Sequence, residues 1–168
     1  MLQAAIQRLR NRKNDEEQGF TLIELMVVVL IIAILIAFAI PTFLGARRRA
    51  QDRSAQSSDR NTLSAADTIY SDNQTYTDVD AAALGAEEPS ITFKAGNAAS
   101  TGPKDVSVDA ADADNLYIVA LSDSGTCFGI WSNKAVGGGG VQFTEVDGGT
   151  CDADSAQVAA NVNWQSEF

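Results

Sequence analysis

Hydrophobic residues are concentrated in one stretch near the amino end of the chain. Residues 25–40 are 16 consecutive positions without a polar side chain, and the stretch reaches back to Phe20 with only Thr21 and Glu24 interrupting it. As a helix, residues 20–40 would be roughly 30 Å long, which matches the hydrocarbon core of a bilayer. The pattern predicts a membrane-spanning helix over residues 20–40 with a single carboxylate near its start.

The pattern after Pro41 predicts that the helix continues as an amphipathic helix over residues 41–73. A proline is tolerated inside a long helix at a kink that neighbouring helices support. Polar residues at 72–75 mark the helix end. The apolar face, spaced as in a helix, consists of Phe43, Ala46, Ala50, Ala65, Ala66, Ile69 and Tyr70.

Arginines are grouped in the first part of this amphipathic helix, at Arg47, Arg48, Arg49 and Arg53. One interpretation is a solvated helix face with charge pairs four residues apart. The other is a contact between subunits, in which the arginines face carboxylates of a neighbouring chain. For any single arginine the solvated helix face is favoured, whereas for the four arginines together the contact between subunits is favoured.

Residues 74–168 contain the signals of short strands. Strand candidates lie at residues 91–94, 106–109, 116–121, 127–131 and 141–146, and the glycines of 137–140 form a turn. A meander of antiparallel strands packed on the amphipathic helix would bury their apolar faces. The expected fold class is therefore α+β, with a long N-terminal helix and a small antiparallel sheet as a globular head.

The charge of the chain restricts its partners. The net charge is −10, and beyond residue 19 there are 8 basic against 19 acidic side chains. Such an excess opposes non-specific attraction to nucleic-acid phosphates, so no specific nucleic acid is expected as a partner.

Catalytic and cofactor motifs were not found in the sequence. The chain has no histidine, which is the usual general base and the commonest metal ligand. The acids of residues 109–115 fail the EF-hand spacing, although an irregular calcium site built from Asp147, Asp152 or Asp154 stays open beside the simpler interpretation of solvated loop acids. Trp131 and Trp164 are expected in core or edge packing. We expect no enzyme activity, cofactor or metal.

The two cysteines, Cys127 and Cys151, both follow the predicted membrane helix. A single pair in an exported domain indicates a disulfide, and in the chain-entropy model a loop of ~25 residues contributes roughly 3–4 kcal/mol. A reduced pair is expected if the domain faces the cytosol. Counting Lys and Arg on the two sides of the apolar helix does not favour a cytoplasmic N-terminus, whereas the cysteines favour a head outside the cell.

Glu24 is the unusual residue of the apolar segment, because a charge in such a position is costly and marks function by default. If the chain is cut between Gly19 and Phe20, the new α-amine lies one helical turn before Glu24. Between neighbouring chains shifted along a helix bundle, Glu24 of one could pair with the amine of the next. Alternatively, Glu24 reaches the lipid headgroups from the end of the span.

The sequence Gly-Phe-Thr-Leu-Ile-Glu of residues 19–24, followed by the apolar stretch and Pro41, resembles the class III signal of type IV pilins and pseudopilins. The resemblance covers residue 18 to about residue 60. It implies that a prepilin peptidase cuts between Gly19 and Phe20 and N-methylates Phe20. It also implies that Glu24 pairs with the Phe20 amine of a neighbour, that Pro41 is a kink, and that the pilin fold carries an external head with a disulfide near the C-terminus.

Several features depart from this family or compete with it. Acidic residues rather than basic ones directly precede Gly19, and Ala33 stands where such pilins often have a helix-breaking glycine. The sequence Ala-Phe-Ala of residues 37–39 fits an ordinary secretory cleavage site, but the apolar run is longer than the usual ~7–15 residues of a secretory signal. Neither ordinary secretion nor a plain membrane anchor explains residues 19–24.

The sequence thus predicts four parts: a leader over residues 1–19, a membrane and filament-core helix over 20–40, an amphipathic helix over 41–73 and a head over 74–168. The expected function is a structural subunit of a type IV pilus, held in the cytoplasmic membrane with its N-terminus inside and later part of an extracellular homopolymeric filament. Its expected partners are further copies of itself, the prepilin peptidase, the pilus assembly machinery and, before assembly, the membrane. The alternatives are a pseudopilin of a type II secretion or DNA-uptake machine, and an anchored adhesive domain that does not polymerise.

Overall fold

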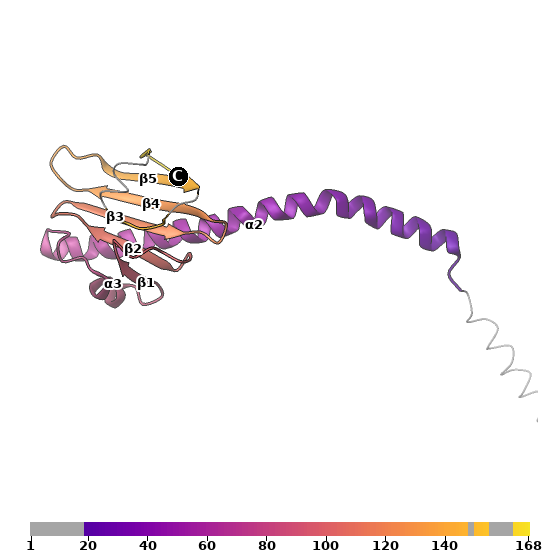
Figure 1. Cartoon of the computed structure of the whole chain (residues 1–168), viewed down its shortest axis with the longest axis horizontal. Helices are drawn as coiled ribbons and strands as arrows, with labels where there is room; N and C mark the ends of the chain where they lie inside the picture. The colour runs from indigo at the N-terminus through magenta and orange to yellow at the C-terminus, as the bar shows by residue number, and fades with distance from the viewer. Residues whose placement is uncertain (1–18, 148–149, 155–162) are drawn as a thin grey trace, which may run out of the picture. The chain divides into compact units, whose positions relative to one another are not determined.

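The computed structural model describes residues 19–147, 150–154 and 163–168. The chain divides into two compact units, one up to Leu44 and the other Gly45–Phe168. A single helix, α2 (Leu22–Asn73, 52 residues), belongs to both units (Figure 1). With a long helix and a small sheet, the expected α+β class is confirmed.

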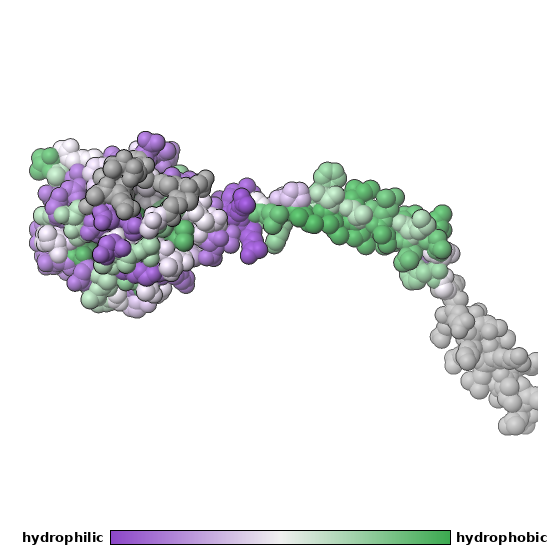
Figure 2. All heavy atoms as spheres, viewed as in Figure 1, coloured by the Kyte–Doolittle hydropathy of each residue, from purple (hydrophilic) through white to green (hydrophobic). Residues whose placement is uncertain are grey.

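The first unit consists of the amino-terminal part of α2 and the residues just before it. Its side chains are apolar and exposed, as the continuous green surface along this part of α2 in Figure 2 shows. By length and composition this helix is able to cross a membrane.

The second unit holds the rest of α2 and a five-stranded sheet in the order β1-β2-β3-β4-β5. Neighbouring strands in the chain are neighbours in the sheet, and β2 to β5 pair in antiparallel fashion. The strands are β1 (Thr92–Ala95), β2 (Asp105–Ala110), β3 (Asn115–Leu121), β4 (Thr126–Asn133) and β5 (Gly140–Asp147).

One strand pair departs from the expected antiparallel meander. β1 lies parallel to β2, with Thr92 opposite Asp105 and Ala95 opposite Val108. The expectation was wrong here because residues 96–104 do not form a hairpin but carry the chain back to the starting end of β1, which a parallel pair requires. Gly96 permits this exit, since a Cβ at this position would collide with the side chain of Asp109.

A short helix, α3 (Ala81–Glu87), occupies part of a region that the sequence analysis left irregular. Asp80 caps it, because its Oδ1 accepts hydrogen bonds from the backbone N–H groups of Ala82 at 2.9 Å and Ala83 at 2.8 Å. An aspartate before Ala-Ala-Ala-Leu is an N-cap signal that the sequence carried.

The core of the second unit lies between α2 and one face of the sheet. Small residues of α2 let the helix approach closely, and they are Ala55, Ser58, Asp59, Thr62, Ala65 and Ala66. The sheet contributes alternate residues of its strands, among them Val106, Ile118, Phe128 and Ile130. Of the expected apolar face of residues 41–73, Ala65 and Ala66 are buried and Ile69 and Tyr70 are half-buried. Its other members, Phe43, Ala46 and Ala50, are exposed.

Candidate functional site

The residues around the expected cleavage position lie just before the start of α2. Gly19 and Phe20 are exposed, and Phe20 keeps 81% of its surface accessible. A side chain added at Gly19 would meet nothing within 4 Å in the described structure. The peptide bond between the two residues is therefore accessible to another protein.

Thr21 begins the helix as its N-cap. The backbone N–H of Glu24 donates to Thr21 Oγ1 at 3.2 Å, and the N–H of Leu25 donates to the Thr21 carbonyl at 3.2 Å. Thr at the cap and Glu three residues later form the sequence of a capping box. The Thr-x-x-Glu spacing signals such a start of the helix, and in the structure it is the backbone N–H of Glu24, not its carboxylate, that bonds to Thr21.

Glu24 is the one charged side chain between residues 19 and 46. It is exposed, and within the described residues its carboxylate makes no hydrogen bond or ion pair. Its backbone N–H is satisfied by Thr21, but the negative charge itself is left without a cation. The site is thus a carboxylate that still requires a positive partner from another molecule once water is excluded.

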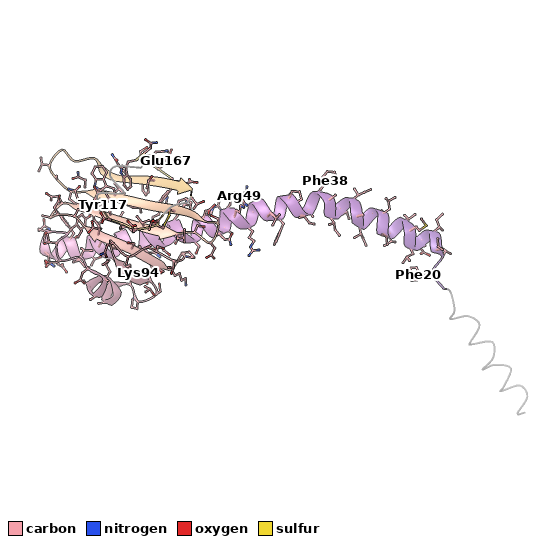
Figure 3. The ribbon with its side chains drawn as sticks, viewed as in Figure 1. Phe20, Phe38, Arg49, Lys94, Tyr117 and Glu167 are labelled. Carbon is pink, nitrogen blue, oxygen red and sulfur yellow. A yellow bond between two sulfur atoms is a disulfide. The ribbon has the colours of Figure 1, made fainter. Side chains whose placement is uncertain are left out.

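Bulky apolar side chains project from α2 along the first unit, among them Phe20 and Phe38, which Figure 3 labels. Between Leu25 and Leu44, no described residue of the chain covers them. Exposed apolar surface of this extent marks a protein or membrane contact. The apolar residues of this unit that keep at least 60% of their surface accessible are Phe20, Leu22, Ile23, Leu25, Met26, Leu30, Leu35, Phe38 and Phe43.

Pro41 lies inside α2. It has no N–H, so the carbonyl of Ala37 lacks its usual donor. Next to it, the hydroxyl of Thr42 donates to the Phe38 carbonyl at 3.0 Å. The helix hydrogen-bond ladder is therefore interrupted at the position for which the family resemblance implies a kink.

The arginine cluster, which we define as Arg47, Arg48, Arg49 and Arg53, lies on exposed positions of α2 in the second unit. The two salt bridges among the described residues join Lys94 to Asp105 and Lys134 to Asp67, so neither involves the cluster. Asp52, the acid within this segment, contacts the β3–β4 turn, where the Ser122 hydroxyl donates to its Oδ1 at 2.8 Å.

The sulfur atoms of Cys127 and Cys151 are bonded in the structure, and the Cα atoms are 5.7 Å apart. The disulfide attaches the segment after β5 to the face of the sheet opposite α2. Tyr117, Trp131 and Trp164 pack beside it, with ring centroids 5.8–6.1 Å apart. Both tryptophans thus pack at the edge of a secondary core.

Of the acids considered for calcium, Asp152 and Asp154 are contacts of one another. Asp152 is buried, and its Oδ1 accepts the backbone N–H of Asp154 at 3.2 Å. Asp147 closes β5. Among the residues that the structure describes, no group of three His, Cys, Asp or Glu side chains could hold a metal ion.

Asp59 is a residue that the sequence analysis did not single out. It is completely buried between α2 and the sheet, and neither carboxyl oxygen has a hydrogen-bond partner within the described chain. Burial raises the pKa of this carboxyl well above its usual range. Its position three and four residues from Thr62 and Ala55 on one helix face was the signal available in the sequence.

Comparison with known proteins supports the amino-terminal site. Residues 15–40 match the family described as the prokaryotic N-terminal methylation motif. The type IV major pilin protein PilA of Myxococcus xanthus is 40% identical over 68 residues, which are 40% of this chain and 31% of that protein. The chain therefore spans about a third of the length of this relative.

Two further relatives extend the comparison. The type II secretion system core protein G of Escherichia coli is 35% identical over 65 residues, 39% of this chain and 45% of its own. The type IV wide pilus major component PilA4 of Thermus thermophilus is 35% identical over 118 residues, 70% of this chain and 79% of its own. No solved structure matched the chain.

The match to PilA4 is longer than all of α2, so it includes part of the head as well as the helix. Together with the methylation motif at residues 15–40, the long helix and the small sheet, this places the chain in the type IV pilin family.

Proposed function

We propose that the chain is a structural subunit of a type IV pilus. In this proposal a prepilin peptidase removes residues 1–19 and methylates the Phe20 amine, and the first unit of the mature chain passes from the membrane into the core of a homopolymeric filament. The observation that carries it is the unpaired Glu24 carboxylate in an exposed apolar helix. The match to a pilus component across most of that relative's length supports it.

Apolar burial alone does not explain why such a subunit leaves the membrane. Lipid tails are as apolar as the side chains of a helix bundle, so the helix gains little hydrophobic free energy by moving between them. The polar groups supply the difference. In lipid, Glu24 and the Phe20 amine of each chain lack a matched partner, whereas in a staggered bundle each meets the opposite charge of a neighbour.

The pair of Glu24 and the Phe20 amine also explains why neighbouring chains assemble with one fixed stagger along their helices. Removing one member of a buried ion pair costs about 3–5 kcal/mol, because the other charge is left without a partner. A subunit placed with the wrong stagger leaves both charges unpaired. Only the register that joins Glu24 of one chain to the amine of the next avoids this cost, and repetition of that register produces a helical filament.

The head is placed outside the cell in this proposal. A disulfide forms and persists in oxidising compartments, and the chain holds Cys127 and Cys151 bonded. The membrane precursor would therefore have its N-terminus inside and its head outside.

The experiment that tests the proposal compares Glu24→Ala with Glu87→Ala, a matched control that removes an exposed acid of α3. Each variant replaces the wild type in the native host, and the chain is quantified in sheared surface filaments and in the membrane. We expect the control in filaments and Glu24→Ala confined to the membrane. Equal amounts of both variants in filaments would contradict the proposal.

A pseudopilin of a type II secretion machine is the second candidate, supported by the relatives named core protein G. Measuring surface filaments and protein secretion in the native host, with and without the chain, separates the two. Long, abundant surface filaments containing the wild-type chain support the pilus subunit, whereas a chain that supports protein secretion without surface filaments supports the pseudopilin.

A further inference from the structure

The second unit carries opposite charges at its two ends. At the end where the head begins, the arginine cluster of α2 is exposed and has no carboxylate within 4.0 Å among the described residues. The β3–β4 turn, which holds the exposed Asp123, is bonded to Asp52 of α2 in the same segment. Figure 3 marks Arg49 on the part of α2 that the strands do not cover.

Four exposed aspartates gather at the other end, where α2 finishes. We call them the acidic end: Asp72, Asp78, Asp80 and Asp112. The loop after α2 is joined to the β2–β3 turn by the N–H of Tyr76, which donates to the Ala113 carbonyl at 2.8 Å. This bond brings Asp112 to the same end as the other three.

Neighbouring backbone groups interact with two of these aspartates. Backbone N–H groups of Asp114 and Asn115, with the Asn115 side chain, lower the pKa of Asp112. Asp80 holds the N-terminus of α3, where a carboxylate is favoured. The nearby cation, Lys134, is already 3.1 Å from Asp67. No salt bridge among the described residues neutralises the four aspartates.

These two ends cannot neutralise each other within one chain. Arg49 and Asp72 are separated along α2 by roughly 35 Å at the rise of an α-helix. This distance exceeds the Debye length of about 10 Å at ordinary ionic strength, so the attraction between them is screened.

The chain itself carries a group of unused cations that could neutralise the acidic end of a second copy. Of the 8 Lys and Arg residues beyond residue 19, Lys94 and Lys134 are used in internal salt bridges. Arg60 lies over the rings of Phe143 and Phe168, at 5.7 and 5.4 Å from their centroids. Apart from Lys104, the unused cations are those of the arginine cluster.

We propose that the arginine cluster of one subunit binds the acidic end of a second copy of the chain. The contact joins two different surfaces, so it does not close on itself but continues from copy to copy, as a filament requires. It rests on the proposed function, and it adds to the Glu24 pair a second, external contact between heads. Anionic lipid headgroups are the competing partner for the arginines, and a charge exchange separates the two.

The test is carried out in the native host. One variant carries Arg48→Glu and Arg49→Glu, the second carries Asp72→Lys and Asp78→Lys, and the third carries all four changes. Asp80 and Asp112 are left intact because they hold α3 and a turn. A control carries Glu87→Lys and Glu167→Lys, the same charge change as the second variant at exposed acids outside the acidic end.

We expect each of the first two variants to lower the amount of filament by about tenfold or more, since like charges then face each other. The four-change variant should recover filaments, and the control should match the wild type. The membrane content of each chain shows whether it is folded and stable. Wild-type amounts of filament in both single-end variants would overturn the proposal.

Failure to recover filaments in the four-change variant would also overturn it, and would assign the arginines to lipid or to another protein. These outcomes are distinct from failure of the proposed function, in which the wild type itself is absent from filaments or Glu24→Ala enters them.

Discussion

Tyr76 donates its hydroxyl hydrogen to Asp67 Oδ1 at 2.7 Å, and the same hydroxyl lies 2.9 Å from the Ser132 hydroxyl. This buried group joins the end of α2 to β4. Burial, the largest cause, raises the pKa of Tyr76, so the phenol stays neutral and able to donate. The Tyr76 side chain therefore links the carboxyl end of α2 to the sheet.

Replacing Tyr76 by Phe should destabilise the head. The change leaves Ser132, which is buried, without its partner, and such a loss costs about 1–3 kcal/mol. Urea unfolding of the purified chain in detergent measures it. Tyr70→Phe is the control, because the Tyr70 hydroxyl reaches Asp114 only at 3.5 Å. An equal loss in both variants would speak against the buried contact.

Because of Asp59, we expect the stability of the head to depend on pH with the opposite sign to the dependence that most carboxylates cause. Its pKa is raised in the folded chain by burial, so the unfolded chain loses the proton first, at about pH 4. Stability is then greatest below that pH and falls as pH rises toward the folded pKa. Asp105 and Asp112, whose pKa values are lowered, change stability only at more acidic pH.

The variant Asp59→Asn should remove this dependence and stabilise the head at neutral pH, since folding then no longer has to protonate a carboxylate that is ionised in the unfolded chain. Thermal unfolding between pH 5 and pH 8 is the measurement, with the exposed Asp72→Asn as control. A wild-type midpoint that rises over this range would show that Asp59 does not titrate as described.

The disulfide should contribute strongly to the stability of the head. Cys127 and Cys151 are buried, and the segment around Cys151 is attached to the sheet by Ser100, whose N–H donates to the Cys151 carbonyl at 2.7 Å. Replacing both cysteines by serine should cost about 2–5 kcal/mol. A reductant should lower the unfolding midpoint of the wild type and leave that of the double serine variant unchanged. If the reductant has no effect on the wild type, the two thiols are not joined in the purified chain.

Glu24 stands at the third position after the Thr21 cap, where a capping box has Glu or Gln, and it also carries an unpaired charge. Glutamine serves at this position of a capping box but carries no charge. We therefore expect Glu24→Gln to be as defective in filament formation as Glu24→Ala. Recovery of filaments by glutamine would mean that the cap, rather than the charge, is required.

The sequence predicted the large features of the fold because they follow from strong local patterns. The apolar run determines α2, and the alternation of residues 116–121 and 127–131 determines β3 and β4. The direction of β1 could not be predicted, because it depends on how residues 96–104 fold back rather than on the strand itself. α3 was missed although Asp80 gives a capping signal, since a helix of 7 residues has little periodicity.

The site was predictable only in part. The lone charge in an apolar run identifies Glu24 without a structure. The gathering of four aspartates at one end of the head could not be predicted, because it arises from contacts between segments far apart in the chain, such as Tyr76 with Ala113. Charge patterns along a sequence do not reveal which ends of a fold they occupy.

The central claim is that the chain is cut at Gly19–Phe20 and assembled through its new N-terminus. Mass spectrometry of the intact chain recovered from sheared surface filaments of the native host tests it most directly. The predicted result is a chain that begins at N-methylated Phe20 and is lighter by two hydrogens for the Cys127–Cys151 bond. A chain that begins at Met1, or at Ile40 after ordinary secretion, would contradict it.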